Sequence, residues 1–280
     1  MTVEQAYREC KNFLEKTEVI DPAFETMCIF EQRFSINRAG LITHGRDEFS
    51  EQNLRDLYQI LDKRAKKQPL QYILGSWEFC GFEFFVGEGV LIPRDDTEVV
   101  LDLCLEFLDK RQSKKAIDLC AGSGAISVAL NKLANADVTA VELSSEAFAY
   151  LEKNSIHNQA DINLINSDVF KCYDDFDDSL FDLIASNPPY IRSEDLKTLQ
   201  DEVQKEPAMA LDGGTDGFDF YRSIIKNWSS KLKKGGALAF ELGEDQADYV
   251  TELMKNEGYT DIRTAYDLSG IKRAIIGIRF

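Results

Sequence analysis

Beyond residue 93 the sequence alternates between short apolar runs and stretches with helical periodicity, and this alternation limits the possible folds more than any other feature. The runs KAIDLC, DVTAVEL, INLINSD, FDLIASN and GALAFELG have the length and apolar character of buried strands. Helical patterns over 125–133 and 145–158 lie between them. Strands that alternate with helices predict a parallel sheet covered by helices.

The last 22 residues, YTDIRTAYDLSGIKRAIIGIRF, contain two β-rich runs around Ser269-Gly270. A tight turn between two such runs predicts a hairpin, so the sheet should end with an antiparallel strand. We therefore expect an α/β, Rossmann-like domain over 93–280.

The first 74 residues are different, because they show helical periodicity. Apolar residues between Val3 and Leu14 recur at three- and four-residue spacing. A second helix should begin at Asp21-Pro22, and a third should run from Ser50 and end before Pro69. We expect a small helical domain over 1–74, followed by a β-hairpin linker over 75–92, where aromatic residues are interrupted by glycines.

Charge and composition argue against several classes of protein. The chain has 49 acidic and 32 basic residues, a net charge of −17. Proteins that bind the phosphate backbone usually carry a basic surface, so direct nucleic-acid binding is not expected. No segment has the length and apolarity of a membrane span, and the N-terminus lacks the pattern of an export signal. We expect a cytoplasmic protein without membrane association.

Six cysteines and two histidines are scattered along the chain without a CxxC pair. This spacing fits neither a zinc site nor a disulfide framework, so we expect no metal and reduced thiols. His44 and His157 lie in no recognisable catalytic context. A Ser-His or Cys-His nucleophile pair is therefore not indicated.

The stretch AIDLCAGSGAISVAL predicts a ligand-binding turn between a strand and a helix. The strand ends near Asp118, glycines stand at 122 and 124, and a helix follows at once. Such a turn lets backbone N–H groups approach a ligand closely. The longer dinucleotide pattern fails at Ser127, and no Gly-Lys-Ser/Thr follows as in a P-loop.

Two further acids end the next strands. Glu142 could accept hydrogen bonds from ribose hydroxyls, and Asp168 could accept one from the exocyclic amine of adenine. Acids around a glycine turn suit a nucleoside without phosphates, and S-adenosylmethionine, with its sulfonium charge, is the common one. The alternative is that the glycines only make a tight turn and the acids are solvated strand ends.

The stretch ASNPPYI follows the fourth apolar run, so Asn187 should lie at the carboxyl edge of the sheet, beside the glycine turn. Pro188 and Pro189 make a stiff loop without N–H donors. The Asn187 side-chain carbonyl and the Pro188 backbone carbonyl could hold both hydrogens of a planar NH₂ group, while Tyr190 offers a flat face. Holding both N–H bonds would stabilise positive charge that develops on the nitrogen. The alternative is an ordinary proline turn.

With these motifs the chain resembles the HemK/PrmC proteins, which methylate a glutamine side-chain nitrogen in the Gly-Gly-Gln loop of peptide chain release factors. The resemblance spans nearly the whole chain, and includes PLQYILGSWEFCGFEFFV, VLIPRDDTE, DLCAGSGAI, NPPYI, EPAMALDGGTDGFDFYRSII and DLSGIKR. NPPY alone is shared with adenine and guanine amino-group methyltransferases, whereas VLIPRDDTE and EPAMALDGG are more specific.

The resemblance implies an S-adenosylmethionine-dependent protein-(glutamine-N5) methyltransferase that releases S-adenosylhomocysteine and acts on release factors. It implies a cofactor site made of Asp118, Cys120, Ala121, Gly122, Ser123, Gly124, Glu142, Leu143, Asp168, Val169 and Asn187. Catalytic residues would be Asn187, Pro188, Pro189 and Tyr190. Substrate-binding residues would be Asn187, Pro188 and Tyr190, together with Arg94, Thr97 and Glu98, and Pro93 would line the same cleft.

Two departures from the family pattern are Cys120, where glycine is usual, and Asp95-Asp96, where Pro-Glu is usual. Three other functions stay open on the residues alone: a ribosomal-protein glutamine methyltransferase, a nucleic-acid amino methyltransferase and a cofactor-binding module without activity. The VLIPRDDTE stretch argues against the first, and the net charge of −17 argues against the second.

Overall fold

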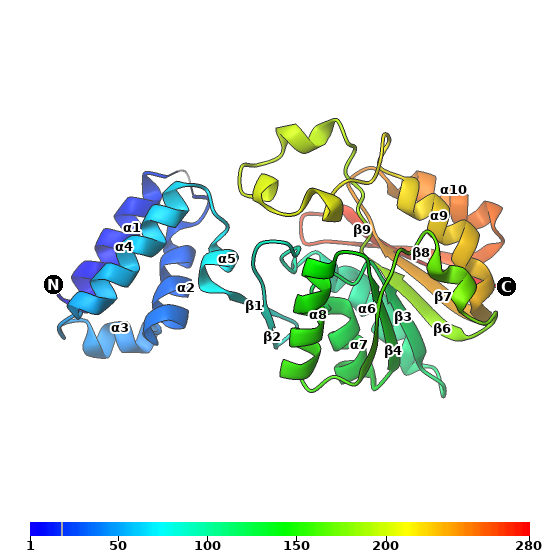
Figure 1. Ribbon diagram of the computed structural model, residues 1–280, viewed down its shortest axis with the longest axis horizontal. Helices are drawn as coiled ribbons and strands as arrows, with labels where there is room; N and C mark the ends of the chain where they lie inside the picture. Colours follow the sequence, from blue (N-terminus) through cyan, green and yellow to red (C-terminus); the bar gives the residue numbers. More distant parts are fainter. Residues whose placement is uncertain (18) are drawn as a thin grey trace. The chain divides into compact units, whose positions relative to one another are not determined.

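Each apolar run selected from the sequence forms a strand of one seven-stranded sheet in the computed structural model, which describes residues 1–17 and 19–280 (Figure 1). The strands are β3 (Lys115–Leu119), β4 (Asp137–Glu142), β5 (Ile162–Asn166), β6 (Phe181–Ser186), β7 (Leu232–Glu241), β8 (Tyr259–Tyr266) and β9 (Lys272–Arg279). Their order is β5-β4-β3-β6-β7-β9-β8. Strands β5, β4, β3, β6 and β7 pair in parallel, each with its neighbour in this order. Strand β9 pairs antiparallel with both β7 and β8, which confirms the predicted terminal hairpin.

Helices cover both faces of this sheet because successive residues of its strands point to opposite sides. On one face α6 (Thr97–Asp109), α7 (Ala125–Ala134) and α8 (Ser145–His157) pack. On the other face lie α9 (Asp219–Trp228) and α10 (Ala247–Asn256). The predicted helices 125–133 and 145–158 thus agree with the structure to within one residue.

The chain divides into two units. The larger comprises Trp77–Leu199 and Glu206–Phe280, and the smaller comprises Met1–Ser76 and Gln200–Lys205. Helices α1 (Val3–Glu15), α2 (Pro22–Phe34), α3 (Arg38–His44), α4 (Glu51–Ala65) and α5 (Leu70–Leu74) form the smaller unit. The predicted starts are confirmed: Asp21 accepts a hydrogen bond from the Phe24 N–H at 2.9 Å, and Ser50 accepts one from Asn53 at 3.1 Å.

The hairpin of β1 (Ser76–Phe79) and β2 (Phe82–Phe85) lies almost entirely in the larger unit, although we expected a linker over 75–92. Phe79 and Phe84 are buried in that unit's core. The carboxamide of Asn154 in α8 also exchanges hydrogen bonds with the backbone N–H and C=O of Phe85, at 2.7 and 3.1 Å. The hairpin is therefore an integral part of the unit that contains the sheet.

Segment 200–205 lies with the helical unit, although it is far away in sequence. The Arg64 side chain, which is fully buried, donates two 2.9 Å hydrogen bonds to Glu25 and one of 2.8 Å to Glu202. A fourth bond reaches the Gln68 carbonyl at 2.6 Å. Because a guanidinium can satisfy two carboxylates and a carbonyl at once, Arg64 fixes this segment to the helices.

Candidate active site

The predicted site residues lie where the strand order reverses. Strand β3 has β4 and β5 on one side and β6 and β7 on the other. The connections after β3 and β6 therefore diverge, and they leave a crevice at the carboxyl ends of the strands. The glycine turn follows β3, and Asn187 follows β6 directly.

The glycine turn has an unusual backbone that brings it close to α8. Cys120, Gly122 and Gly124 have φ angles of 64°, 56° and 88°. At Gly124 a Cβ would lie 2.6 Å from the Leu151 side chain, so a larger residue would not fit. Asn154 donates a 2.9 Å hydrogen bond to the Ser123 carbonyl and holds the turn from α8.

Glu142 ends β4 beside this turn. Its carboxylate accepts hydrogen bonds from the backbone N–H groups of Gly122, at 2.8 Å, and Ser144, at 2.7 Å. Burial raises the pKa of Glu142, and these N–H groups oppose the rise. Each carboxylate oxygen keeps a second acceptor position, so the side chain can still bind ligand hydroxyls.

Asp168 follows β5 and lies on the same side of the crevice. It accepts a hydrogen bond from the Phe170 N–H at 2.9 Å and pairs with the Lys171 ammonium at 2.9 Å. Burial tends to raise its pKa, but these two partners together hold the pKa below its usual value. Asp168 is therefore ionised at neutral pH, as an acceptor should be.

Asp118 is the most deeply buried acid of the site. Its Oδ2 accepts a 2.5 Å hydrogen bond from the Ser127 hydroxyl, whereas Oδ1 has no hydrogen-bond partner among the described residues. Burial raises the pKa of Asp118 to about 7, and the nearby charge of Glu142 adds to this rise. An unsatisfied carboxylate oxygen beside a cavity is suited to a cationic ligand.

Two cavities adjoin at the turn. They share Leu91, Cys120, Gly122 and Asn187. The first is further lined by Gly89, Glu142, Leu143, Ser144, Ala147, Asp168, Val169, Pro189, Pro207, Met209, Ala210 and Phe220. The second is further lined by Ile92, Pro93, Arg94, Thr97, Asp118, Ala121, Ser123, Ala125 and Ile126. Most of the predicted cofactor residues therefore line one or both of these adjoining cavities.

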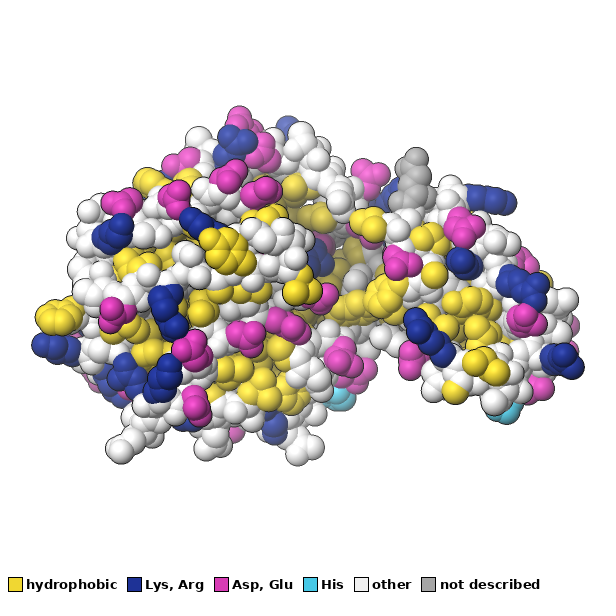
Figure 2. Space-filling model, turned by 180° about the vertical axis from the view of Figure 1, so that it is seen from behind, with side chains coloured by type: hydrophobic (Ala, Val, Ile, Leu, Met, Phe, Trp, Pro, Cys, Tyr) yellow, Lys and Arg dark blue, Asp and Glu magenta, His cyan; other side chains and the backbone are white. Residues whose placement is uncertain are grey.

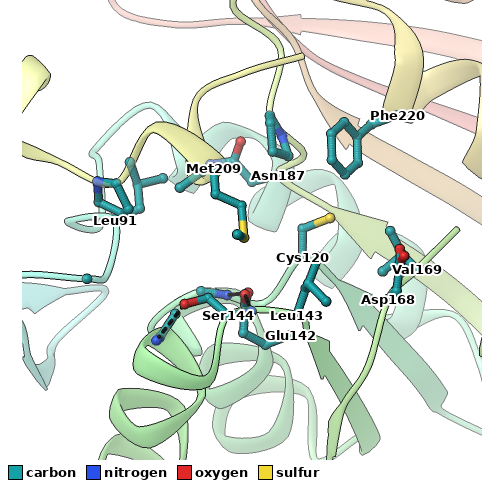
Figure 3. A pocket seen from close by; sticks show the side chains of 16 residues that line it. Leu91, Cys120, Glu142, Leu143, Ser144, Asp168, Val169, Asn187, Met209 and Phe220 are labelled. Atoms are coloured by element: carbon teal, nitrogen blue, oxygen red, sulfur yellow. Dashed lines mark hydrogen bonds between the residues drawn. The ribbon is translucent and has the colours of Figure 1, made fainter. Parts of the chain in front are cut away.

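Several apolar residues of the first cavity were missed by the sequence analysis. Figure 3 shows Met209 extending toward Glu142, with Phe220 on the side of Val169 and Leu91 opposite. Met209 is 57% exposed, which is high for a methionine. Leu91 stands in a loop, Met209 in a short 3₁₀ helix (Ala208–Ala210) and Phe220 at the start of α9, where no periodic pattern marks them. The EPAMALDGG stretch, noticed only through the resemblance, contains Met209.

The NPPY stretch contacts the cavities unevenly. Asn187 lines both of them, and Pro189 lines the first, whereas Pro188 is buried and Tyr190 is outside both linings. The Tyr190 hydroxyl lies 3.3 Å from Oε1 of Glu241, and its carbonyl accepts a 2.9 Å hydrogen bond from Gln246. Tyr190 thus anchors the loop, and its predicted contact with a substrate stays a prediction.

The predicted substrate-binding residues between 93 and 98 do not all line the cavities. Arg94 lines the second cavity and forms an ion pair with Glu206, whose other oxygen accepts from the Ile92 N–H at 3.0 Å. This pair joins the two stretches that are most specific to the family. Thr97 lines the second cavity, whereas Glu98 lies outside both linings and is 3.6 Å from the Cys80 sulfur.

The two departures from the family pattern are accommodated. Cys120 adopts the positive φ of the usual glycine, and its side chain borders the cavity, where burial raises the pKa of the thiol. Asp96 pairs with Arg273 at 3.3 Å and so contacts the DLSGIKR stretch. Neither substitution blocks the cavities.

Two family models match the chain. The profile described as PrmC N-terminal domain matches residues 5–75, and that described as Methyltransferase small domain matches 94–246. A methyltransferase structure from Pyrococcus furiosus superposes with a TM-score of 0.53 at 19% identity, over 82% of this chain and 99% of that chain, which shows the fold.

Two curated relatives are similar over most of their length, and both are named release factor glutamine methyltransferase. The protein from Geobacter sulfurreducens is 38% identical over 99% of this chain and 96% of its own. The protein from Clostridium acetobutylicum is 36% identical over 87% and 86%. On this similarity and on the two matched domains, the chain belongs to the family of release factor glutamine methyltransferases.

Proposed function

We propose that this methyltransferase transfers the methyl group of S-adenosylmethionine to the side-chain nitrogen of the glutamine in the Gly-Gly-Gln loop of peptide chain release factors. The observation that carries the proposal is the position of Asn187, which borders both cavities beside the acid-lined glycine turn. Family membership supplies the substrate class.

The residues around the first cavity fit S-adenosylmethionine. Glu142 would accept from the ribose hydroxyls and Asp168 from the adenine amine, with Leu143, Val169 and Phe220 packed around the base. Asp118, whose Oδ1 has no partner among the described residues, would favour the positive charges of the methionine part. When bound, S-adenosylmethionine supplies an electrophilic methyl group on a sulfonium sulfur.

Asn187 and Pro188 would hold the substrate amide. The Asn187 side-chain nitrogen donates to the Thr97 hydroxyl at 3.3 Å, which directs the other end of the carboxamide, Oδ1, away from Thr97. Within the described part of the chain, neither Oδ1 nor the Pro188 carbonyl accepts a hydrogen bond. Two free acceptors can take both N–H bonds of a primary amide and stabilise the charge that develops on nitrogen, before one proton leaves to solvent.

The test is single-turnover methylation of a release factor by Asn187→Ala, with saturating S-adenosylmethionine. Loss of one preorganised acceptor should lower the rate by roughly 10²–10³-fold and leave cofactor affinity nearly unchanged. Asn187→Asp keeps acceptor oxygens, so it should retain more activity than the alanine variant. A folded Asn187→Ala protein that methylates at the wild-type rate would refute the amide clamp.

The other candidate functions are separated by a labelling experiment. The wild-type protein is incubated with labelled S-adenosylmethionine and with total cell protein or RNA. Label in a release factor supports the proposal. Label in a ribosomal protein or in RNA supports the corresponding alternative enzyme, and no label in any fraction supports a cofactor-binding module without activity. Figure 2 shows basic and acidic side chains interspersed on the face in view, without a continuous basic stripe there.

A further inference from the structure

Gln246 stands at the N-terminus of α10, and only 8% of it is exposed. Its side-chain nitrogen donates hydrogen bonds to the carbonyls of Tyr190, at 2.9 Å, and Gly217, at 3.2 Å. Its side-chain oxygen accepts one from the Gly243 N–H at 2.9 Å, and the Tyr221 hydroxyl lies 3.1 Å from the same oxygen. This carboxamide therefore joins the NPPY loop after β6, the turn before α9 and the turn after β7.

These partners allow the Gln246 carboxamide only one orientation. The two carbonyls can only accept, and the Gly243 N–H can only donate. With the carboxamide turned over, its oxygen would face two carbonyl oxygens and its NH₂ group would face an N–H. A residue of the same size that cannot donate would therefore lose both bonds to the carbonyls.

Glycines let the three connections approach one another closely. A Cβ at Gly217 would lie 2.6 Å from the Tyr190 carbonyl oxygen, and a Cβ at Gly243 would lie 3.0 Å from Cδ2 of the Tyr190 ring. Larger residues at these two positions would push the connections away from Tyr190. Because the glycines leave this space, a single side chain, that of Gln246, can reach all three connections.

The NPPY loop is held at both of its ends. At one end, β6 is paired with β3 and β7 as far as Ser186. At the other end, Gln246 binds the Tyr190 carbonyl, and the next N–H, that of Ile191, bonds to the Leu211 carbonyl at 2.9 Å. The loop is therefore fixed from the sheet on one side and from these contacts on the other.

The residues between these two ends form a stiff segment. Pro188 and Pro189 have fixed φ angles, so few backbone angles can absorb a movement of the loop. A displacement of the Tyr190 carbonyl would be transmitted to the Pro188 carbonyl and to Asn187. These are the groups that would hold the substrate amide.

We propose that Gln246 is a positioning residue for methyl transfer, which fixes the Tyr190 end of the NPPY loop and so places the acceptors of Asn187 and Pro188. The inference rests on the proposed function of Asn187, and it assigns Gln246 no contact with substrate or cofactor. The three backbone groups that Gln246 binds belong to residues outside the linings of both cavities. Its loss should therefore lower kcat and leave cofactor affinity nearly unchanged.

The experiment compares Gln246→Glu and Gln246→Met with the wild type, by steady-state kinetics with a release factor, calorimetry with S-adenosylmethionine, and melting temperature. The glutamate keeps the size and the acceptor for Gly243, but its ionised carboxylate cannot donate to the two carbonyls. The methionine keeps the length and loses all of the bonds. Each variant should lose about tenfold in kcat, with KM and cofactor affinity nearly unchanged, because a positioned group is displaced.

The matched control is Glu252→Ala in the same helix. Glu252 is exposed and forms only a surface pair with Lys255, at 2.8 Å. This substitution should leave kcat unchanged, because Glu252 has no printed contact with the NPPY loop and its surface pair contributes little to stability.

A double variant provides the readout that a merely structural role would not move. In an Asn187→Ala background, Gln246→Met should cause little further loss of kcat, because both substitutions act through the same loop. Independent structural damage would instead make the two losses multiply.

Three results would overturn the inference: wild-type kcat in folded Gln246→Met, a loss of cofactor affinity as large as the loss of kcat, or losses that multiply in full in the double variant. Asn187→Ala alone separates this failure from that of the proposed function. If Asn187→Ala is fully active, the amide clamp itself fails. If it is impaired while Gln246→Met is normal, only the role of Gln246 fails.

Discussion

The backbone N–H of Gly122 lies 2.8 Å from Oε2 of Glu142, so the end of β4 is hydrogen-bonded to the glycine turn after β3. This bond has two consequences. It holds the turn in the shape that borders both cavities, and it orients the carboxylate toward them. Glu142 therefore holds the proposed cofactor site in shape before any ligand is bound.

Replacing Glu142 by alanine should weaken S-adenosylmethionine binding by roughly 1–3 kcal/mol, because the ribose hydroxyls lose their acceptor. Isothermal titration calorimetry measures this change. The matched control is Asp137→Ala at the exposed start of the same strand, where only a 3.7 Å surface pair with Lys115 is lost. An unchanged affinity of Glu142→Ala would show that Glu142 does not bind the ribose hydroxyls.

Cofactor affinity should depend on pH through Asp118. Its pKa of about 7 in the folded protein means that it is largely protonated below neutral pH. A cationic ligand favours the ionised form, so binding releases a proton and affinity should rise as pH increases from about 6 to 8. Calorimetry in buffers of different ionisation enthalpy measures the released proton.

Asp118→Asn provides the comparison for this pH dependence. It keeps a side chain that can bond to Ser127 but does not titrate. The slope of affinity against pH should become smaller. A slope identical to that of the wild type would show that the ionisation of Asp118 is not coupled to ligand binding.

Gly213 lies against the NPPY loop, where there is no room for a side chain. A Cβ at Gly213 would be 2.7 Å from the Tyr190 Cα and 2.9 Å from the Pro189 carbonyl oxygen. Gly213→Ala should displace the loop and lower kcat by about tenfold or more, since small shifts of positioning groups are costly. Steady-state kinetics with a release factor measures this.

Gly40→Ala is the control for that substitution. Gly40 is in a helix, and the nearest atoms to its Cβ would be at an ordinary 3.5 Å. The control should leave kcat unchanged and raise stability slightly. Equal kinetics for the two alanine variants would contradict the assigned role of Gly213.

Arg64→Met should destabilise the protein by roughly 3–5 kcal/mol, because it leaves the half-buried carboxylate of Glu25 without its cation. Denaturant titration measures the free energy of unfolding. The double variant Arg64→Met with Glu25→Gln should recover part of the loss. Arg55→Met, which loses an exposed 3.7 Å pair with Glu51 and an exposed 2.9 Å hydrogen bond to Gln52, should change stability by less than about 0.5 kcal/mol.

The sequence by itself indicated the strands of the large sheet, the helices α1, α2, α4, α7 and α8, and the two motif-bearing loops. Apolar runs predicted every strand of the large sheet, and Asp21-Pro22 and Ser50 predicted two helix starts, because these signals act between near neighbours. The sequence also predicted that the glycine turn lies beside Asn187, since the carboxyl ends of parallel strands lie at the same edge of a sheet.

Only the tertiary structure decided which distant residues complete the site. Arg94 and Glu206 are 112 residues apart, and Thr97 and Asn187 are 90 apart, so no local pattern relates them. Met209 enters the cavity from a short 3₁₀ helix (Ala208–Ala210), and Phe220 enters it from the start of α9. Their roles arise from contacts that exist only once the sheet order has brought their strands and loops together, because side-chain chemistry at a site depends on neighbours that the chain supplies from far away.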